Sequence, residues 1–126
     1  GFNQKNLNLD VKIKIIEYQA SNGNEYFLEI VNKKDILFGL LRLRISNKIA
    51  MVRELHIYGQ ALNLGEEGFD SQHLGLGKML MQKAEEIAKE NGFKEIKVIS
   101  GIGVREYYKK LGYKLDKKKI YMIKEL

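Results

Sequence analysis

Two glycines, Gly75 and Gly77, lie where the sequence changes from a strand-like pattern to a helical one. They belong to a Q-x-x-G-x-G pattern that starts at Gln72 and is followed by Lys78. The first amide groups of a helix have no intrahelical partner and carry partial positive charge, and glycine lets an anion come close to them. The pattern therefore predicts a phosphate or pyrophosphate site at the start of a helix. The backbone groups expected to hold the anion are those of Gln72, Gly75, Leu76, Gly77 and Lys78.

A purely structural role for the two glycines is also open, because glycine allows a turn to pack closely against its neighbours. Leu80 stands where the dinucleotide-binding pattern has its third glycine, and the Gly-Lys-Ser/Thr ending of a P-loop is absent. The expected phosphate site is therefore of neither of these two kinds.

Cysteine is absent from the 126 residues, and the only histidines are His56 and His73. Disulfides, thiolate zinc sites, iron–sulfur ligation and a cysteine nucleophile are therefore excluded within this chain, and a histidine-rich metal site is not expected. The sequence has no run of 18 apolar residues and does not open on a secretory signal, so we expect no membrane partner.

The net charge of +6 lies entirely in the last part of the chain. Residues 92–126 hold 10 Lys and Arg against 4 Asp and Glu, whereas residues 1–91 hold 12 basic and 12 acidic side chains. A basic surface attracts a phosphate-bearing cofactor or a nucleic acid. An ordinary solvated surface explains the excess equally well, and composition does not separate the two.

The pattern of apolar residues and turns predicts a single α+β domain over residues 1–126. Four strands form an antiparallel meander, because their connections are too short for a parallel crossover, and an Asn-Gly turn is expected at residues 21–24. A long helix, a strand, a short helix and a final hairpin complete a mixed sheet with two covering helices. The expected strands are residues 11–16, 26–31, 36–45, 49–58, 93–100, 113–115 and 120–123, and the expected helices are residues 75–91 and 104–111.

Residues 59–71 form a connection longer than the usual length of about four to six residues. Beside the expected anion site, such a connection is a candidate lid. A surface loop without a function fits the same residues equally well.

A second motif, YKKLGY, occupies residues 108–113. Together with the glycine pattern and the order of the expected elements, it resembles the GCN5-related N-acetyltransferases (GNAT). More specific stretches resemble the C-terminal domain of the Elongator catalytic-subunit family: DILFGLLRLR at residues 35–44, RELHIYG at 53–59, QHLGLG at 72–77 and VISGIGVREYY at 98–108. This closer resemblance covers roughly residues 35–123.

The resemblance implies a mostly antiparallel twisted sheet and the acetyl-CoA-binding domain of an enzyme that forms a carboxymethyl-type group at C5 of the wobble uridine, position 34, of tRNA. Family members place a radical S-adenosylmethionine domain before this one, and its 4Fe–4S cluster cannot bind to a chain without cysteine. We therefore expect a fragment of a cytoplasmic enzyme, with acetyl-CoA, tRNA and that preceding domain as partners. The absence of an initiator methionine before Gly1 is consistent with a fragment. The fragment alone is expected to bind acetyl-CoA without modifying tRNA.

The resemblance also implies residue roles. The extended backbone of Glu54, Leu55, His56 and Ile57 would pair with the pantetheine arm of the coenzyme, although core packing explains the two apolar residues as well. Tyr108 would donate a proton or hydrogen bond to the coenzyme sulfur, which suits a phenol, although its helical spacing also fits a core position. Glu54 or His56 could act as a general base or position a water molecule, and Glu54 could equally pair with an arginine, so the base stays unassigned.

One departure from the general fold is visible in the sequence: only a turn separates the first two strands, where ordinary members have two helices that build the acceptor site. Another part of the enzyme would have to supply that platform.

Two other functions remain open. A free-standing protein or small-molecule N-acetyltransferase would share the fold, although the missing helices argue against it. A basic RNA-binding module would use the lysines near the end of the chain, namely Lys109, Lys110 and Lys117 to Lys119.

Overall fold

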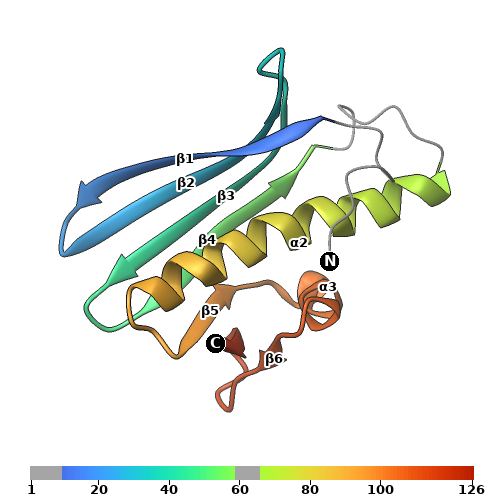
Figure 1. Cartoon of the computed structure of the whole chain (residues 1–126). Helices are drawn as coiled ribbons and strands as arrows, with labels where there is room; N and C mark the ends of the chain where they lie inside the picture. Colours follow the sequence, from blue (N-terminus) through green and yellow to red (C-terminus); the bar gives the residue numbers. More distant parts are fainter. Residues whose placement is uncertain (1–9, 59–65) are drawn as a thin grey trace.

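The computed structural model describes residues 10–58 and 66–126, and for residues 66–74 it describes the backbone. A seven-stranded sheet carries one long helix across its face and a short helix beside it (Figure 1). This confirms the predicted α+β class with two covering helices. The elements are β1 (Val11–Ala20), β2 (Gly23–Asn32), β3 (Leu37–Ser46), β4 (Ala50–Ile57), α2 (Glu66–Glu90), β5 (Glu95–Ile99), the 3-10 turn η2 (Ile102–Val104), α3 (Arg105–Lys110), β6 (Lys114–Leu115) and β7 (Tyr121–Glu125).

The strands follow the order β1-β2-β3-β4-β5-β7-β6 across the sheet. The first four form the predicted antiparallel meander, and β4 and β5 are the one parallel pair among the described strands. β1 and β2 are joined by two residues, so no helix intervenes between them, as expected. The turn differs from the prediction by one position: Ser21 and Asn22 form it, and Asn22 takes the positive φ of 62° that asparagine tolerates.

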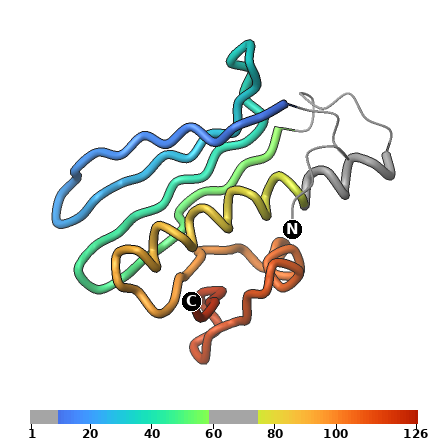
Figure 2. Tube along the Cα trace, viewed as in Figure 1, coloured from blue at the N-terminus to red at the C-terminus, as the bar shows by residue number. Residues whose placement is uncertain are grey.

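The core lies between one face of the sheet and α2. Leu28, Leu41 and Val52 point from the strands toward Leu80 and Ala84 of the helix, and all five are fully buried. Because strand side chains alternate between faces, the neighbouring residues of β2 and β3 lie on the other side of the sheet. Figure 2 shows α2 running back along the sheet from the end of β4 toward the start of β5.

A hydrogen-bonded group around Glu85 ties the second half of α2 to the last strands. The Tyr113 hydroxyl donates to Glu85 Oε2 at 2.7 Å, and Lys124 Nζ lies 3.1 Å from Glu85 Oε1. Lys124 also lies 5.7 Å from the centre of the Tyr113 ring. These contacts link the side chains of Lys124, from β7, and of Tyr113, from the chain after α3, to the helix α2.

The predicted start of the long helix is wrong. α2 begins at Glu66, nine residues before the predicted start at Gly75, and Gly75 and Gly77 lie inside it. The chain has no proline that would stop the helix before Gly75. The predicted connection at residues 59–71 is correspondingly shorter. Its residues 59–65 lie outside the described part of the chain, so the lid stays a prediction.

Gly77 has a packing reason to be glycine. A Cβ at this position would collide with the hydroxyl group of Tyr107, which comes from α3. That hydroxyl is buried and has no hydrogen-bond partner among the described residues. Gly77 therefore has the packing role that the sequence left open: α3 can pack against α2 because Gly77 has no side chain.

No helix in the described part of the chain combines the length and the apolar character needed to cross a bilayer.

Substitutions at this contact test the packing of α2 against α3. Gly77→Ala should destabilise the protein by about 1–3 kcal/mol, because the new methyl group meets the Tyr107 hydroxyl. Tyr107→Phe should be neutral or stabilising by about 1 kcal/mol, since it removes a buried hydroxyl that has no partner among the described side chains. Chemical denaturation gives both values. In the Tyr107→Phe background, Gly77→Ala should lower the free energy of unfolding by a smaller amount. A Gly77→Ala variant as stable as the parent would contradict the contact.

Candidate functional site

β4 and β5 separate after two residue pairs. The parallel ladder joins Met51 to Lys97 and Val52 to Val98, and it includes no later residue of either strand. β4 nevertheless continues to Ile57, still paired on its other side with β3. A bulge in β4, where Arg53 is the extra residue, follows directly after the last parallel pair. From this point to His56, the edge of β4 that faces β5 pairs with no described strand and could bind an extended ligand by its backbone.

Glu54, Arg42 and His56 form a polar group on the sheet face opposite α2. Arg42 Nη2 lies 3.0 Å from Glu54 Oε1, and His56 Nε2 lies 3.5 Å from Glu54 Oε2. The His56 ring also stacks on Tyr58 at 6.4 Å. The predicted pairing of Glu54 with an arginine is therefore present. The geometry brings Glu54 and His56 together but does not decide which of them acts as a base.

Leu55 and Ile57 point to the other side, into the core. Both are partly buried and pack against the central cluster, and Leu55 lies opposite Leu41 in the sheet. The core alternative for their side chains is confirmed. Because a strand pairs through its backbone, this packing leaves the proposed pantetheine contact unaffected.

Tyr108 is buried among aromatic rings. Its ring makes edge contacts with Tyr107 at 5.4 Å and with Tyr113 at 6.0 Å. Burial raises the pKa of Tyr108 to about 12, and burial, followed by the neighbouring Tyr108, raises the pKa of Tyr107 to about 12. Both phenols therefore hold their protons at neutral pH. Tyr108 thus occupies a core position, as its helical spacing allowed. Its role at the coenzyme sulfur stays a prediction.

The residues predicted to hold the pyrophosphate lie within α2. Leu76 and Gly77 are buried, whereas Lys78 is exposed. In a regular α-helix the amide of each interior residue donates to the carbonyl four residues earlier. The predicted terminal-turn site is therefore not formed in this structure at Gly75, Leu76, Gly77 and Lys78. Gln72 belongs to the same helix, and its side chain lies outside the description.

The sequence predicted only a packing or supporting role for Tyr107 and no role for Ser100 or Arg105. Each of the three has a buried polar atom without a partner among the described residues: Ser100 Oγ, Arg105 Nε and the Tyr107 hydroxyl. All three come from the segment that directly follows β5, where it leaves β4. Next to them Ile102 is 80% exposed. Buried polar groups normally have partners, so these atoms suit a site that a ligand or water completes. The available sequence signal was a serine and an arginine flanking Gly101 and Gly103.

Among the described residues no group of three or more His, Cys, Asp or Glu side chains could hold a metal ion.

Comparison with known proteins agrees with this geometry. The model of the Acetyltransferase (GNAT) family matches residues 7–113. The "tRNA uridine(34) acetyltransferase" of Dehalococcoides mccartyi is 44% identical over 117 residues, which cover 82% of this chain and 26% of that protein. "Elongator complex protein 3" of Saccharomyces cerevisiae is 48% identical over 115 residues, which cover 79% of this chain and 21% of that protein. The chain thus spans about a quarter of the length of these curated relatives.

Solved structures show the same fold. The archaeal Methanocaldococcus infernus Elp3 with an N-terminal deletion matches with a TM-score of 0.74 and 42% identity, over 92% of this chain and 30% of that one. Tetrahymena GCN5 matches with a TM-score of 0.61 at 15% identity, over 80% of this chain and 68% of that one, which shows likeness of fold alone. The sheet that separates between β4 and β5, the two helices on one face and the family match together show that this chain belongs to the Acetyltransferase (GNAT) family.

Proposed function

We propose that this chain is the acetyl-CoA-binding domain of a cytoplasmic enzyme that modifies the wobble uridine of tRNA. The observation that carries the proposal is the edge of β4 next to β5, which from Glu54 to His56 pairs with no described strand. In the segment that follows β5, polar atoms of Ser100, Arg105 and Tyr107 have no partner among the described residues. The names of the relatives support the tRNA substrate. The carboxymethyl chemistry, the preceding radical S-adenosylmethionine domain and its 4Fe–4S cluster belong to the same proposal and concern parts of the enzyme outside this chain.

Acetyl-CoA would supply an acetyl group activated as a thioester. The backbone of β4 at Glu54, Leu55 and His56 would hold its pantetheine arm as an added strand, which suits the amides of that arm. The Tyr108 phenol, protonated at neutral pH, would hold a proton toward the coenzyme sulfur.

The pyrophosphate requires a rearrangement. The amides of Gly75 to Lys78 reach an anion only if the first turns of α2 unwind, so that the helix begins near Gly75. Gly68, Gly75 and Gly77 lower the cost of unwinding, because each glycine disfavours the helix by about 1 kcal/mol relative to alanine. We propose this shift as the structural change that accompanies coenzyme binding, with Gln72 in the part that opens.

Titration with acetyl-CoA tests the site and the rearrangement together. Calorimetry should detect binding, the helical circular dichroism signal should fall on saturation, and amide NMR shifts should cluster at residues 54–57 and 75–78. The turn at Ser21 and Asn22, at the other end of the sheet, is the internal control and should not shift. Absence of affinity for acetyl-CoA, with tRNA present as well as without it, would contradict the proposal. Release of CoA that requires an added amine would favour the free-standing N-acetyltransferase instead.

Tyr108→Phe tests the phenol. The dissociation constant of acetyl-CoA should stay within about twofold, because the ring remains, whereas tRNA-dependent CoA release by the enzyme should fall at least about 100-fold. The raised pKa sets the pH dependence: the phenol keeps its proton up to about pH 12, so its loss should not limit turnover near pH 10, where an ordinary tyrosine ionises. A Tyr108→Phe variant with parental turnover would remove Tyr108 from the mechanism.

A further inference from the structure

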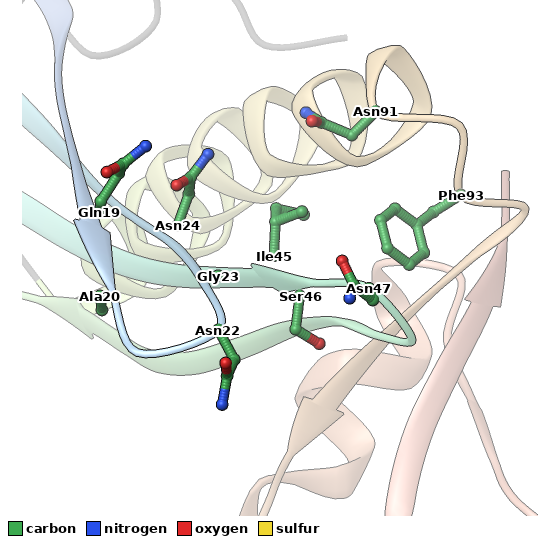
Figure 3. A pocket seen from close by; sticks show the side chains of 10 residues that line it. All are labelled: Gln19, Ala20, Asn22, Gly23, Asn24, Ile45, Ser46, Asn47, Asn91 and Phe93. Carbon is green, nitrogen blue, oxygen red and sulfur yellow. The ribbon is translucent and has the colours of Figure 1, made fainter.

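A cavity lies at the opposite end of the sheet from the separated strands. It has a volume of about 570 Å³ and opens between the β1–β2 turn, the β3–β4 turn and the chain that leaves α2 (Figure 3). Asn91, at its α2 side, follows Gly77 by 14 residues, or about 20 Å along a helix. The cavity therefore shares no residue with the proposed acetyl-CoA site.

Neutral amide side chains dominate its lining. Five of the ten lining residues are asparagine or glutamine, and none carries a charge. Each amide offers both a donor and an acceptor, so the cavity suits a neutral ligand with several hydrogen-bonding groups on its edge. The lining consists of Gln19, Ala20, Asn22, Gly23, Asn24, Ile45, Ser46, Asn47, Asn91 and Phe93.

Two of the five amide side chains are held by hydrogen bonds within the chain, and three are available to a ligand. Asn91 Nδ2 donates to the Ile87 carbonyl at 2.8 Å, and Asn24 Nδ2 donates to Glu17 at 3.2 Å. Gln19, Asn22 and Asn47 make no side-chain hydrogen bond within the described part of the chain, and all three are exposed at the cavity. Their donors and acceptors are free to meet a ligand.

The walls of the cavity are held in place before any ligand binds. Arg44 pairs with the buried Glu25 at 2.7 Å and also donates to the Ser21 carbonyl, which fixes the β1–β2 turn. The Ser46 amide closes the β3–β4 turn by donating to the Ile49 carbonyl at 3.0 Å. A pre-formed site of this kind loses little conformational freedom on binding.

The remaining features point to a nucleotide. Phe93 places a partly buried aromatic ring at one side of the cavity (Figure 3), and such rings stack on unpaired bases. Lys48 and Lys94, the residues that follow Asn47 and Phe93, are exposed and form no ion pair among the described residues. A neutral lining, with an exposed lysine next in sequence to Asn47 and another next to Phe93, fits a base inside the cavity and phosphate outside it.

We propose that this cavity binds one unpaired nucleotide. The base lies against Phe93, its edge meets the amides of Asn47 and the neighbouring turn, and Lys48 and Lys94 contact the phosphates. The cavity volume lies in the usual range for small-ligand sites. The proposal does not rest on coenzyme binding, because the two sites are separate.

NMR titration of the full chain tests the proposal with three probes: uridine and adenosine monophosphates, a single-stranded RNA oligonucleotide, and the same sequence as a duplex. Saturable shifts are expected at Gly23, Asn47 and Asn91, with a dissociation constant below about 1 mM for the monophosphates or the single strand. The duplex should not enter the cavity, because its bases are paired. An oligonucleotide that binds about tenfold tighter than the monophosphates identifies an RNA strand as the source, and equal affinities identify a free nucleotide.

Three variants remove the ligand groups while keeping the fold. Phe93→Leu keeps an apolar side chain and should weaken binding about tenfold. Asn47→Ala should weaken it at least about fivefold. Asn22→Gly keeps the left-handed turn and removes the amide. The matched control replaces Lys117, Lys118 and Lys119 by alanine, which removes the most basic loop and should leave this binding unchanged.

Salt dependence separates the cavity from general electrostatic binding. Two phosphate contacts predict a slope of about −1.4 in a plot of log affinity against log salt for a single strand. The proposal fails if no probe gives saturable shifts, if the shifts map to residues 117–119 and vanish only in the lysine variant, or if a neutral disaccharide occupies the cavity while nucleotides do not.

Discussion

The parallel pairing of β4 with β5 is the constraint from which most of this structure follows. Neighbouring parallel strands can be joined only by a segment that returns along the sheet, and α2 is that segment. Its return brings Leu80 and Ala84 over the inner residues of β2 to β4, which forms the core. The same pairing lasts for only two residue pairs, because β5 then turns into η2 while the bulge at Arg53 bends β4 away. The core and the candidate site thus have one origin.

α2 packs against the core with its second half, and its first turns are the part proposed to unwind when the coenzyme binds. Its second half is fixed by the core and by Glu85, which meets Tyr113 and Lys124. Its first half contains glycines that weaken a helix. Gly77 lets α3 approach so closely that the Tyr107 hydroxyl is buried, with no hydrogen-bond partner among the residues that the structure describes. A stable half joined to a weak half is the arrangement expected of an element whose end changes conformation while the rest keeps its place.

The two ends of the sheet offer different chemistry. At one end lie the edge of β4 that pairs with no described strand, buried phenols, and polar atoms without a partner in the described part of the chain. These features suit a long ligand that carries its own amides. At the other end, three tight turns place neutral amides around Phe93. About 20 Å of helix separates them. Two ligands could therefore bind at once, and one fold could hold an acyl carrier and a nucleotide without either blocking the other.

The sequence by itself determined the order of elements, the α+β class, the meander and the family, because alternation and turn residues act locally and the motifs at residues 72–77 and 108–113 are specific. The sequence also predicted two possible roles for each of two residues. Tyr108 could lie in the core or act at the coenzyme sulfur, and Glu54 could act as a base or pair with an arginine. Only the tertiary structure decided where α2 begins, that Gly77 faces Tyr107, that Glu54 pairs with Arg42, and that amides from three distant turns share a cavity. Those facts depend on contacts between segments far apart in the chain, and a local pattern carries no information about which distant side chain will fill the space beside it.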